Sequence, residues 1–219
     1  DADSESGVRT SYFKHGNKVG KKDIKQYIDV LSPALKFLIS SVAYPSLLPK
    51  TISECGGYSA VVLGKPILFH IYDDRERFYT IIKDCLKYAD LGVTHPKTGE
   101  NIVNYLVRKG KYYYDDMCDL IKSGADALTP NKEGRKPIFT DLDNCGHCDI
   151  FITLGGEDPN VLDVDGMPLY HQLAKRQSLR SHHEDLVNLG MNINYVSPYG
   201  TGLWLLRKTS PVLLEQLRA

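Results

Sequence analysis

The sequence predicts an all-α fold, a solenoid of about five short helix pairs with an N-terminal helical cap. The first observation is a set of evenly spaced glycines, Gly64, Gly99, Gly134, Gly166 and Gly200. Successive members are 35, 35, 32 and 34 residues apart. The second is a helix-end signal that keeps a constant distance from these glycines, and the third is helical periodicity upstream of them. A single short helix pair cannot bury its apolar face alone, so a repeat of this length predicts stacking.

The helix-end signal stands ten residues before four of these glycines, at positions 89, 124, 156 and 190. It reads Ala-Asp in the first copy and begins with glycine in the others, as in Gly124-Ala125-Asp126. Glycine after a helix supplies the left-handed conformation that ends it, and glycine in a hairpin supplies the positive φ of the turn. Proline, as at Pro137, starts the first helix of a pair without losing a needed N–H.

Residues 54–219 resemble the ankyrin-repeat family, whose period is about 33 residues. The segment Gly166-Met167-Pro168-Leu169-Tyr170-His171 is a variant of the G-x-T-P-L-H signature, although the Thr is missing from every copy. The resemblance implies a hairpin followed by two helices in each repeat. The third and fourth repeats are shortened between their helices. The fifth is truncated, with residues 210–217 as a final capping helix.

Upstream of the repeats we expect two further segments. Residues 1–22 are polar and without periodicity, which predicts a flexible leader. Residues 23–53 have helical spacing and form the predicted cap. Pro33 is expected to split this segment into two helices, which Pro45 and Pro49 end. The alternative is that it is the tail of a larger upstream domain.

Composition excludes several classes of protein. Lys and Arg together number 27, as do Asp and Glu, so the overall basic excess of a typical nucleic-acid binder is missing. The longest apolar run, near residues 34–44, is interrupted by Lys36 and falls short of a membrane span of about 20 residues. Five cysteines are an odd number without a disulfide framework, which fits a reducing compartment. We therefore expect neither nucleic acid nor membrane as a partner.

An ankyrin array presents a concave face that is built from hairpin tips and first helices, and such a face binds proteins. Aromatic and charged residues at these places are the candidate partner-binding residues: His70, Tyr72, Asp73, Asp74, Arg75, Lys109, Tyr112, Tyr113, Asp141, Asp143, His171, Lys175, Arg176, Trp204, Arg207 and Lys208. The tyrosine run at residues 112–114 is either a contact patch or a solvated loop with one ring packed inward. Trp204 is either a core residue or a binding anchor. We expect the chain to be a monomer.

A thiol oxidoreductase is the alternative from another class, because Cys145 and Cys148 form a C-x-x-C motif. The ankyrin consensus, however, places Gly-His between its two helices, and Gly146-His147 fits that position. The cysteines lack a second Cys/His pair at zinc-site spacing. The sequence shows no catalytic constellation, so we expect no catalytic residues, metal or cofactor in this chain.

The short, divergent and tyrosine-rich array after a helical lead-in is similar to the C-terminal domain of OspC-type bacterial type III effectors. That resemblance implies that the chain recruits a host inflammatory caspase. An upstream domain, which calmodulin activates, would then convert a caspase arginine to its ADP-riboxanated form and block pyroptosis. It also implies secretion by a bacterium into the host cytoplasm.

The family's catalytic Glu-x-His triplet does not occur in the 219 residues, so this chain would be the recognition half and not the enzyme. Another ankyrin effector, a viral host-range protein or a eukaryotic scaffold would show the same repeats.

Charge alternates along the predicted stack, and the fourth repeat is basic at Lys175 and Arg176. Charge complementarity sets partner choice and association rate. We expect the charge-reversed variant Lys175→Glu/Arg176→Glu to capture its partner more weakly while its circular dichroism spectrum stays unchanged. If this variant binds its partner with unaltered affinity, neither residue belongs to the binding site.

Overall fold

The computed structural model describes residues 36–37, 41, 47–110, 112–144, 146–175, 183–198 and 200–209. The chain divides into two units, Asp1–Gly56 and Gly57–Ala219. The predicted leader, residues 1–22, lies outside the described residues, as do most of the predicted cap and the predicted capping helix at 210–217.

The first unit contains helix α4 (Leu48–Glu54). The prediction that Pro49 ends a helix is wrong, because Pro49 lies in the first turn of α4. Proline is well tolerated there, since the first N–H groups of a helix have no intrahelical partner. The Thr51 hydroxyl donates to the Leu47 carbonyl at 3.0 Å, and Lys36 pairs with Glu54 at 2.8 Å.

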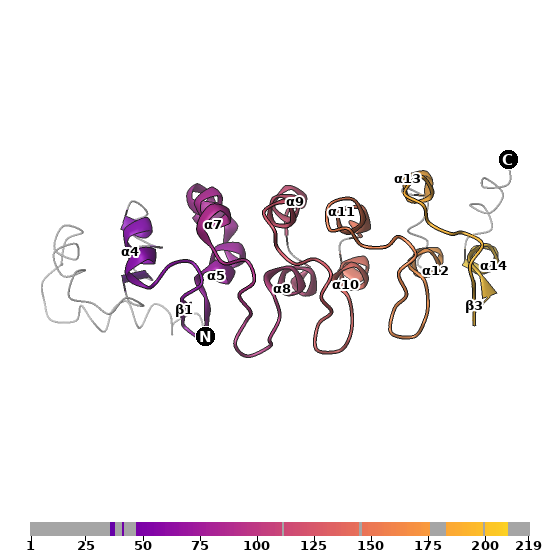
Figure 1. The fold of residues 1–219 in the computed structure, drawn as a ribbon, viewed down its shortest axis with the longest axis horizontal. Helices are drawn as coiled ribbons and strands as arrows, with labels where there is room; N and C mark the ends of the chain where they lie inside the picture. The colour runs from indigo at the N-terminus through magenta and orange to yellow at the C-terminus, as the bar shows by residue number, and fades with distance from the viewer. Residues whose placement is uncertain are drawn as a thin grey trace, which may run out of the picture. The chain divides into compact units, whose positions relative to one another are not determined.

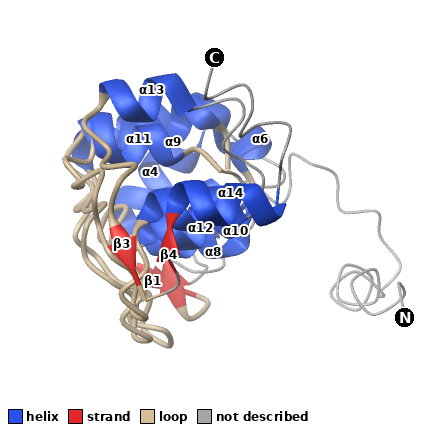
Figure 2. Cartoon of the chain, turned by 90° about the vertical axis from the view of Figure 1, so that its right-hand side faces the viewer, coloured by secondary structure: helices blue, strands red, loops and turns tan. Residues whose placement is uncertain are grey.

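The second unit is mostly helical, and its helices are short. In chain order they are α5 (Ile67–Asp73), α6 (Arg75–Phe78), the 3-10 helix η3 (Tyr79–Ile81), α7 (Ile82–Tyr88), α8 (Ile102–Lys109), α9 (Tyr114–Lys122), α10 (Pro137–Asn144), α11 (Cys148–Thr153), α12 (Leu169–Lys175), α13 (His183–Asn188) and α14 (Gly202–Thr209). Figure 1 shows α8–α9, α10–α11 and α12–α13 as pairs that follow one another side by side. Figure 2 shows two layers, with α8, α10, α12 and α14 in one and α9, α11 and α13 in the other.

Short antiparallel hairpins precede the first helices. Strand β1 (Val61–Val62) pairs with β2 (Lys65–Pro66), and β3 (Val196–Ser197) pairs with β4 (Gly200–Thr201). A single bridge joins Leu162 to Pro168 in the corresponding place before α12. The five hairpin glycines of the sequence pattern all have positive φ, between 70° and 100°, which confirms their predicted role in the turns.

The helix-end signal is confirmed, and it has a second part that we did not predict. After α9, the Gly124 N–H donates to the Ile121 carbonyl and the Ala125 N–H to the Leu120 carbonyl, both at 3.0 Å, which is a Schellman ending. The next residue of the signal then accepts a backbone N–H two positions further on. This bond recurs at Asp90, Asp126, Asp158 and Asn192, with lengths between 2.8 and 3.0 Å. The Asp or Asn of each copy therefore fixes the turn that leads into the next hairpin.

Apolar side chains of neighbouring helix pairs form the core of the second unit. Ile102, Val103 and Leu106 of α8 are fully buried, as are Leu169 and Tyr170 of α12. Helix α8 packs against α10, and α12 packs against α14. In the part of the chain that the structure describes, no helix has the length and apolar composition needed to cross a membrane.

Two buried asparagines of α8 tie this helix to the following turn. The Asn101 amide donates to the Asp126 carbonyl at 3.0 Å, and the Asn104 amide to the Thr129 carbonyl at 2.8 Å. Asn101 is also the N-cap of α8, because its side-chain oxygen accepts the Asn104 N–H at 2.8 Å. One side chain thus both starts a helix and joins it to the next pair.

We expect Asn101→Ala to lower the free energy of unfolding by about 1–3 kcal/mol, since it removes a helix cap and a buried hydrogen bond together. Urea denaturation measures this change. The control is Asn188→Ala, because Asn188 is exposed at the end of α13 and its loss should change stability by less than about 0.5 kcal/mol. Equal effects of the two substitutions would contradict the assigned role.

Candidate functional site

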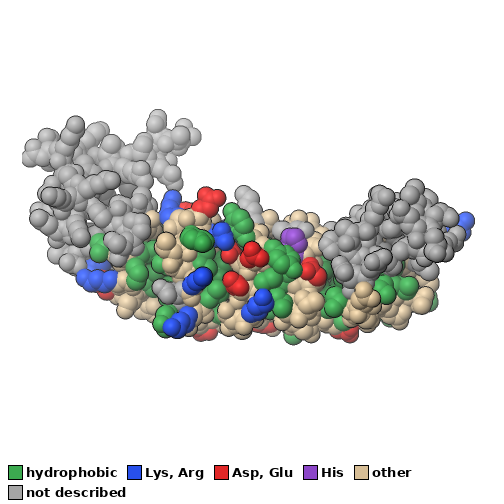
Figure 3. Space-filling view, turned by 90° about the horizontal axis from the view of Figure 1, so that it is seen from above, with side chains coloured by type: hydrophobic (Ala, Val, Ile, Leu, Met, Phe, Trp, Pro, Cys, Tyr) green, Lys and Arg blue, Asp and Glu red, His purple; other side chains and the backbone are tan. Residues whose placement is uncertain are grey.

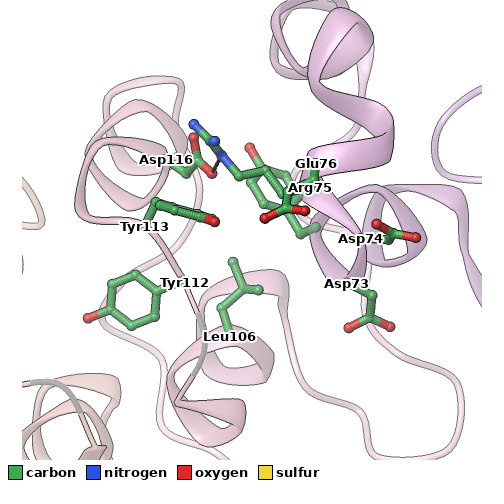
Figure 4. A pocket seen from close by; sticks show the side chains of 9 residues that line it. Asp73, Asp74, Arg75, Glu76, Leu106, Tyr112, Tyr113 and Asp116 are labelled. Atoms are coloured by element: carbon green, nitrogen blue, oxygen red, sulfur yellow. Dashed lines mark hydrogen bonds and ion pairs between the residues drawn. The ribbon is translucent and has the colours of Figure 1, made fainter.

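A cavity of about 320 Å³ lies between the end of α5, α6, α8 and the start of α9. Its lining combines aromatic, acidic and basic side chains: Tyr72, Asp73, Asp74, Arg75, Glu76, Leu106, Tyr112, Tyr113 and Asp116 (Figure 4). Six of these are predicted partner-binding residues, brought together from segments about 40 positions apart in the sequence. Figure 3 shows apolar side chains interspersed with acidic and basic ones on the face seen from above.

Arg75 forms one side of the cavity. Its Nε donates to the carboxylate of Asp116, which is only 6% exposed. Its guanidinium lies 4.1 Å from the centroid of the Tyr113 ring, a cation–π contact that Figure 4 also shows. The hydrogen bond to Asp116 raises the pKa of Arg75. This contact holds α6 against the start of α9.

Asp73 lies at the opposite edge of the cavity, where three side chains converge on it. The Tyr105 hydroxyl donates to the Asp73 carboxylate at 3.0 Å, and Lys65 and Lys109 form ion pairs with it. Burial by itself would raise the pKa of Asp73, but the hydrogen bonds from Lys109 and Lys65 outweigh it and hold that pKa below its usual value. The predicted residue Lys109 therefore reaches the edge of the site through Asp73.

Tyr72 lines the cavity but is only 6% exposed, so the prediction that it is a surface contact is wrong. Its hydroxyl has no hydrogen-bond partner among the described residues. Burial raises the pKa of Tyr72, so the hydroxyl stays protonated and can both donate and accept. A buried hydroxyl without a partner costs about 1–3 kcal/mol.

Asp141 was also expected on the surface, and the structure corrects this because its side chain is fully buried. Its carboxylate accepts the Tyr112 hydroxyl and, at 2.6 Å, the backbone N–H of His147. Burial raises the pKa of Asp141. Asp141 therefore positions the Tyr112 ring at the cavity rather than meeting a partner itself. Of the two alternatives for the tyrosine run, the one with an inward ring applies to Tyr112, whereas Tyr113 is 50% exposed.

His171 is the third correction, since it too is fully buried. Its Nδ1 lies 3.0 Å from the Ser197 hydroxyl, and its Nε2 lies 3.1 Å from the Tyr195 carbonyl oxygen. Burial lowers the pKa of His171. His171 thus joins α12 to the next hairpin, and its side chain is not exposed to a partner.

The other predicted residues do not line the cavity. His70 is half-buried, with its Nε2 2.7 Å from the Val62 carbonyl oxygen, and Asp143 pairs with Arg135. Lys175 and Arg207 are exposed.

Trp204 is 46% exposed, so its interpretation as a core residue is wrong. Arg176 lies outside the described residues, and Lys208 is described only as part of α14.

Three lining residues were not predicted: Glu76, Leu106 and Asp116. Asp116 ends the acidic tyrosine run 112–116, so that run carried a usable signal. Leu106 has the apolar spacing of a core residue, and nothing in the sequence distinguishes it from its neighbours on α8. Glu76 lies next to Arg75, but its position at the cavity depends on the break between α5 and α6 at Asp74.

The C-x-x-C segment lies between two helices, as expected, but the thiol of Cys148 is not accessible to a substrate. Gly146 and His147 lie between α10 and α11, as predicted, and Cys148, the first residue of α11, is buried. Cys145 lies outside the described residues. Among the side chains that the structure describes, no group of three or more His, Cys, Asp or Glu could hold a metal ion.

No protein-family model matches this chain, and a search of curated proteins finds no match.

The buried His171 predicts a pH dependence of stability. Its folded pKa lies below the ordinary value of 6.5, so the unfolded chain binds the proton first as pH falls. The free energy of unfolding should therefore decrease below about pH 6.5, by at most about 1.4 kcal/mol per pH unit for one histidine. His70 acts in the same direction, because burial lowers its pKa as well. Urea denaturation between pH 7.5 and 5 should give a smaller slope for His171→Gln than for the unaltered chain.

The control for this measurement is Lys175→Gln, a substitution at an exposed position that leaves both histidines in place and should leave the slope unchanged. If His171→Gln fails to fold, the ring of His171 can be titrated by NMR in the unaltered chain. A His171 pKa at or above 6.5 would contradict the prediction.

Proposed function

We propose that residues 54–219 form an ankyrin-repeat module that binds a partner protein. The observation that carries the proposal is the repeated order of structure: a hairpin with its glycine turn, a first helix, a second helix and a turn that an Asp or Asn side chain fixes. This order keeps the ten-residue offset between helix end and hairpin in four successive copies. The side-by-side helix pairs of Figure 1 support the same proposal.

Binding of a protein is the function that such a surface serves best. Rigid helix pairs lose little conformational entropy on association, so much of the contact energy becomes affinity. Exposed aromatic side chains of the kind that dominate interfaces are available, including Tyr113 and Trp204. Apolar residues are exposed near the hairpins as well, among them Val61, Leu63, Val164 and Val196. On a surface that binds no partner, these exposed aromatic and apolar side chains would have no role.

The partner that we propose is a host inflammatory caspase, and the chain is the recruiting domain of an OspC-type effector. The basis is the resemblance in architecture, an array of divergent repeats that follows a helical lead-in. In this proposal the effector acts in the host cytoplasm after type III secretion. A separate upstream domain ADP-riboxanates the arginine of the captured caspase, and this chain is not itself an enzyme and needs no cofactor.

Capture from host cytosol tests the proposal. The immobilised full chain should enrich an inflammatory caspase by at least about tenfold over an empty matrix, as read by mass spectrometry. The purified caspase should then bind the chain in calorimetry with a Kd of about 1 μM or tighter, the range of a specific interface. A matched pair of variants locates the surface: Tyr113→Ala should weaken binding, whereas Tyr88→Ala, at a more exposed tyrosine at the end of α7, should not. Failure of all inflammatory caspases to bind would refute this assignment.

A further inference from the structure

Three successive hairpins share a turn in which one residue makes the same backbone hydrogen bonds. The equivalent residues are His95, Asn131 and Asp163. In each hairpin the backbone N–H of this residue donates to the carbonyl of the residue after the turn glycine. Its own carbonyl accepts the N–H of that glycine, and all six bonds have lengths between 2.7 and 3.0 Å. The three turns are therefore built alike, and the side chains at this position can be compared directly.

The side chain of this residue accepts two further N–H groups of the turn. Asn131 accepts those two and four positions further on, both at 3.0 Å, and Asp163 accepts the corresponding pair at 2.9 and 2.8 Å. In the first of the three hairpins the acceptor is instead the ring nitrogen Nδ1 of His95, which lies 3.3 Å from the Lys97 nitrogen and 3.4 Å from that of Thr98. This turn has one more residue before its glycine than the other two, and the longer imidazole side chain spans it.

Nδ1 of His95 can accept these N–H groups only while it carries no proton. The neutral ring then holds its proton on Nε2. Carboxamide and carboxylate oxygens remain acceptors between about pH 5 and 8, whereas histidine ordinarily changes its charge within this range. A proton on Nδ1 turns the acceptor into a donor that faces two N–H donors. The hairpin of His95 therefore differs from the next two in its dependence on pH.

Two aromatic rings hold the His95 ring in place. The Tyr105 ring of α8 stacks on it with 5.7 Å between centroids and 14° between planes. The Phe69 ring of α5 meets it edge-on, also at 5.7 Å. Lys65 and Lys109 lie over the Tyr105 ring, and both are ion-paired with the last residue of α5. The ring thus lies against apolar surface beside two cations, an environment that favours its neutral form.

The carboxylate that interacts electrostatically with His95 is that of Glu100, in the same hairpin. Its oxygens already accept three hydrogen bonds, two from Arg108 at 2.5 and 2.8 Å and one from the Thr98 hydroxyl at 2.7 Å. Burial alone would raise the pKa of Glu100, but these hydrogen bonds hold that pKa below its usual value. The end of the Lys132 side chain lies beside the turn glycine of this hairpin. Glu100 therefore stays ionised while histidine titrates, and its bonds to Arg108 and Thr98 compete with any bond to a protonated ring.

We infer that His95 makes the hairpin at residues 94–99 a pH-sensitive part of the surface, closed while the ring is neutral and released when the ring is protonated. On protonation the ring takes one proton from water, and the N–H groups of Lys97 and Thr98 turn to solvent. The closed turn is favoured at higher pH and is lost as the pH falls through the range in which histidine titrates. The inference goes beyond the proposed function and needs no partner, although hairpin tips are where a repeat array meets one.

NMR spectroscopy of the full chain tests the inference in two steps. At about pH 7.5 the ring-nitrogen shifts should show neutral His95 with its proton on Nε2. Between about pH 7.5 and 5.5 the amides of Lys97 and Thr98 should lose exchange protection by about two- to tenfold, after correction for the intrinsic rate at each pH, as expected for one ordinary hydrogen bond. The corresponding amides of the Asn131 and Asp163 hairpins should change less. A neutral ring with its proton on Nδ1, unchanged protection of Lys97 and Thr98, or an equal loss in all three hairpins would overturn the inference.

Two matched variants assign the effect to one histidine. His95→Asn supplies the side chain that the next hairpin uses, so the protection of Lys97 and Thr98 should no longer depend on pH. His147→Asn is the control, because the ring of His147 lies against two tyrosine rings in the connection between α10 and α11, and the pH response should persist there. If the response survives in His95→Asn or disappears in His147→Asn, the inference is wrong. The ring-nitrogen measurement uses the unaltered chain, so it remains decisive should His95→Asn fail to fold.

Discussion

Burial between neighbouring helix pairs is the constraint on which the second unit depends. Its described α-helices have between four and nine residues, and isolated helices of this length are not stable in water. Ile102, Val103 and Leu106 of α8 are fully buried only because further helices cover them. The hydrogen bonds from Asn101 and Asn104 to the following turn then fix how far the α8–α9 pair is displaced from the next. Apolar contact supplies the stability, and these polar contacts supply the register.

The cavity arises where one pair departs from this regular pattern. Helices α8 and α9 are joined by a short connection, whereas α6 and η3 intervene between α5 and α7. The break at Asp74 turns the chain so that Arg75 faces the start of α9 instead of solvent. A regular connection would bring neither Arg75 nor Glu76 to this place. Local departures from an otherwise consistent design are where functional sites are commonly found.

The sequence predicted features that depend on the local backbone and missed those that depend on distant contacts. Hairpin turns and helix ends could be read from glycines, because a positive φ is a local requirement. The burial of His171 could not, since it is set by Ser197, 26 residues further on, and the Arg75–Asp116 pair spans 41 residues. Pro49 was misread because proline is compatible with both the end and the beginning of a helix. Six lining residues were nevertheless predicted, since aromatic and charged side chains in connections are good indicators of surface sites.

Two buried polar side chains, Asp141 and His171, bond across boundaries between helix pairs. Asp141 joins the connection before α9 to the one before α11, and His171 joins α12 to the hairpin of the next pair. Each such group is bonded across a boundary between pairs, where it helps to specify one arrangement of the stack. Tyr72 lines the cavity, and its buried hydroxyl, like that of Thr140, has no hydrogen-bond partner among the described residues. Not every buried polar group is therefore used to join neighbouring helix pairs, and the boundary beside the cavity depends on the Arg75–Asp116 and Tyr105–Asp73 contacts instead.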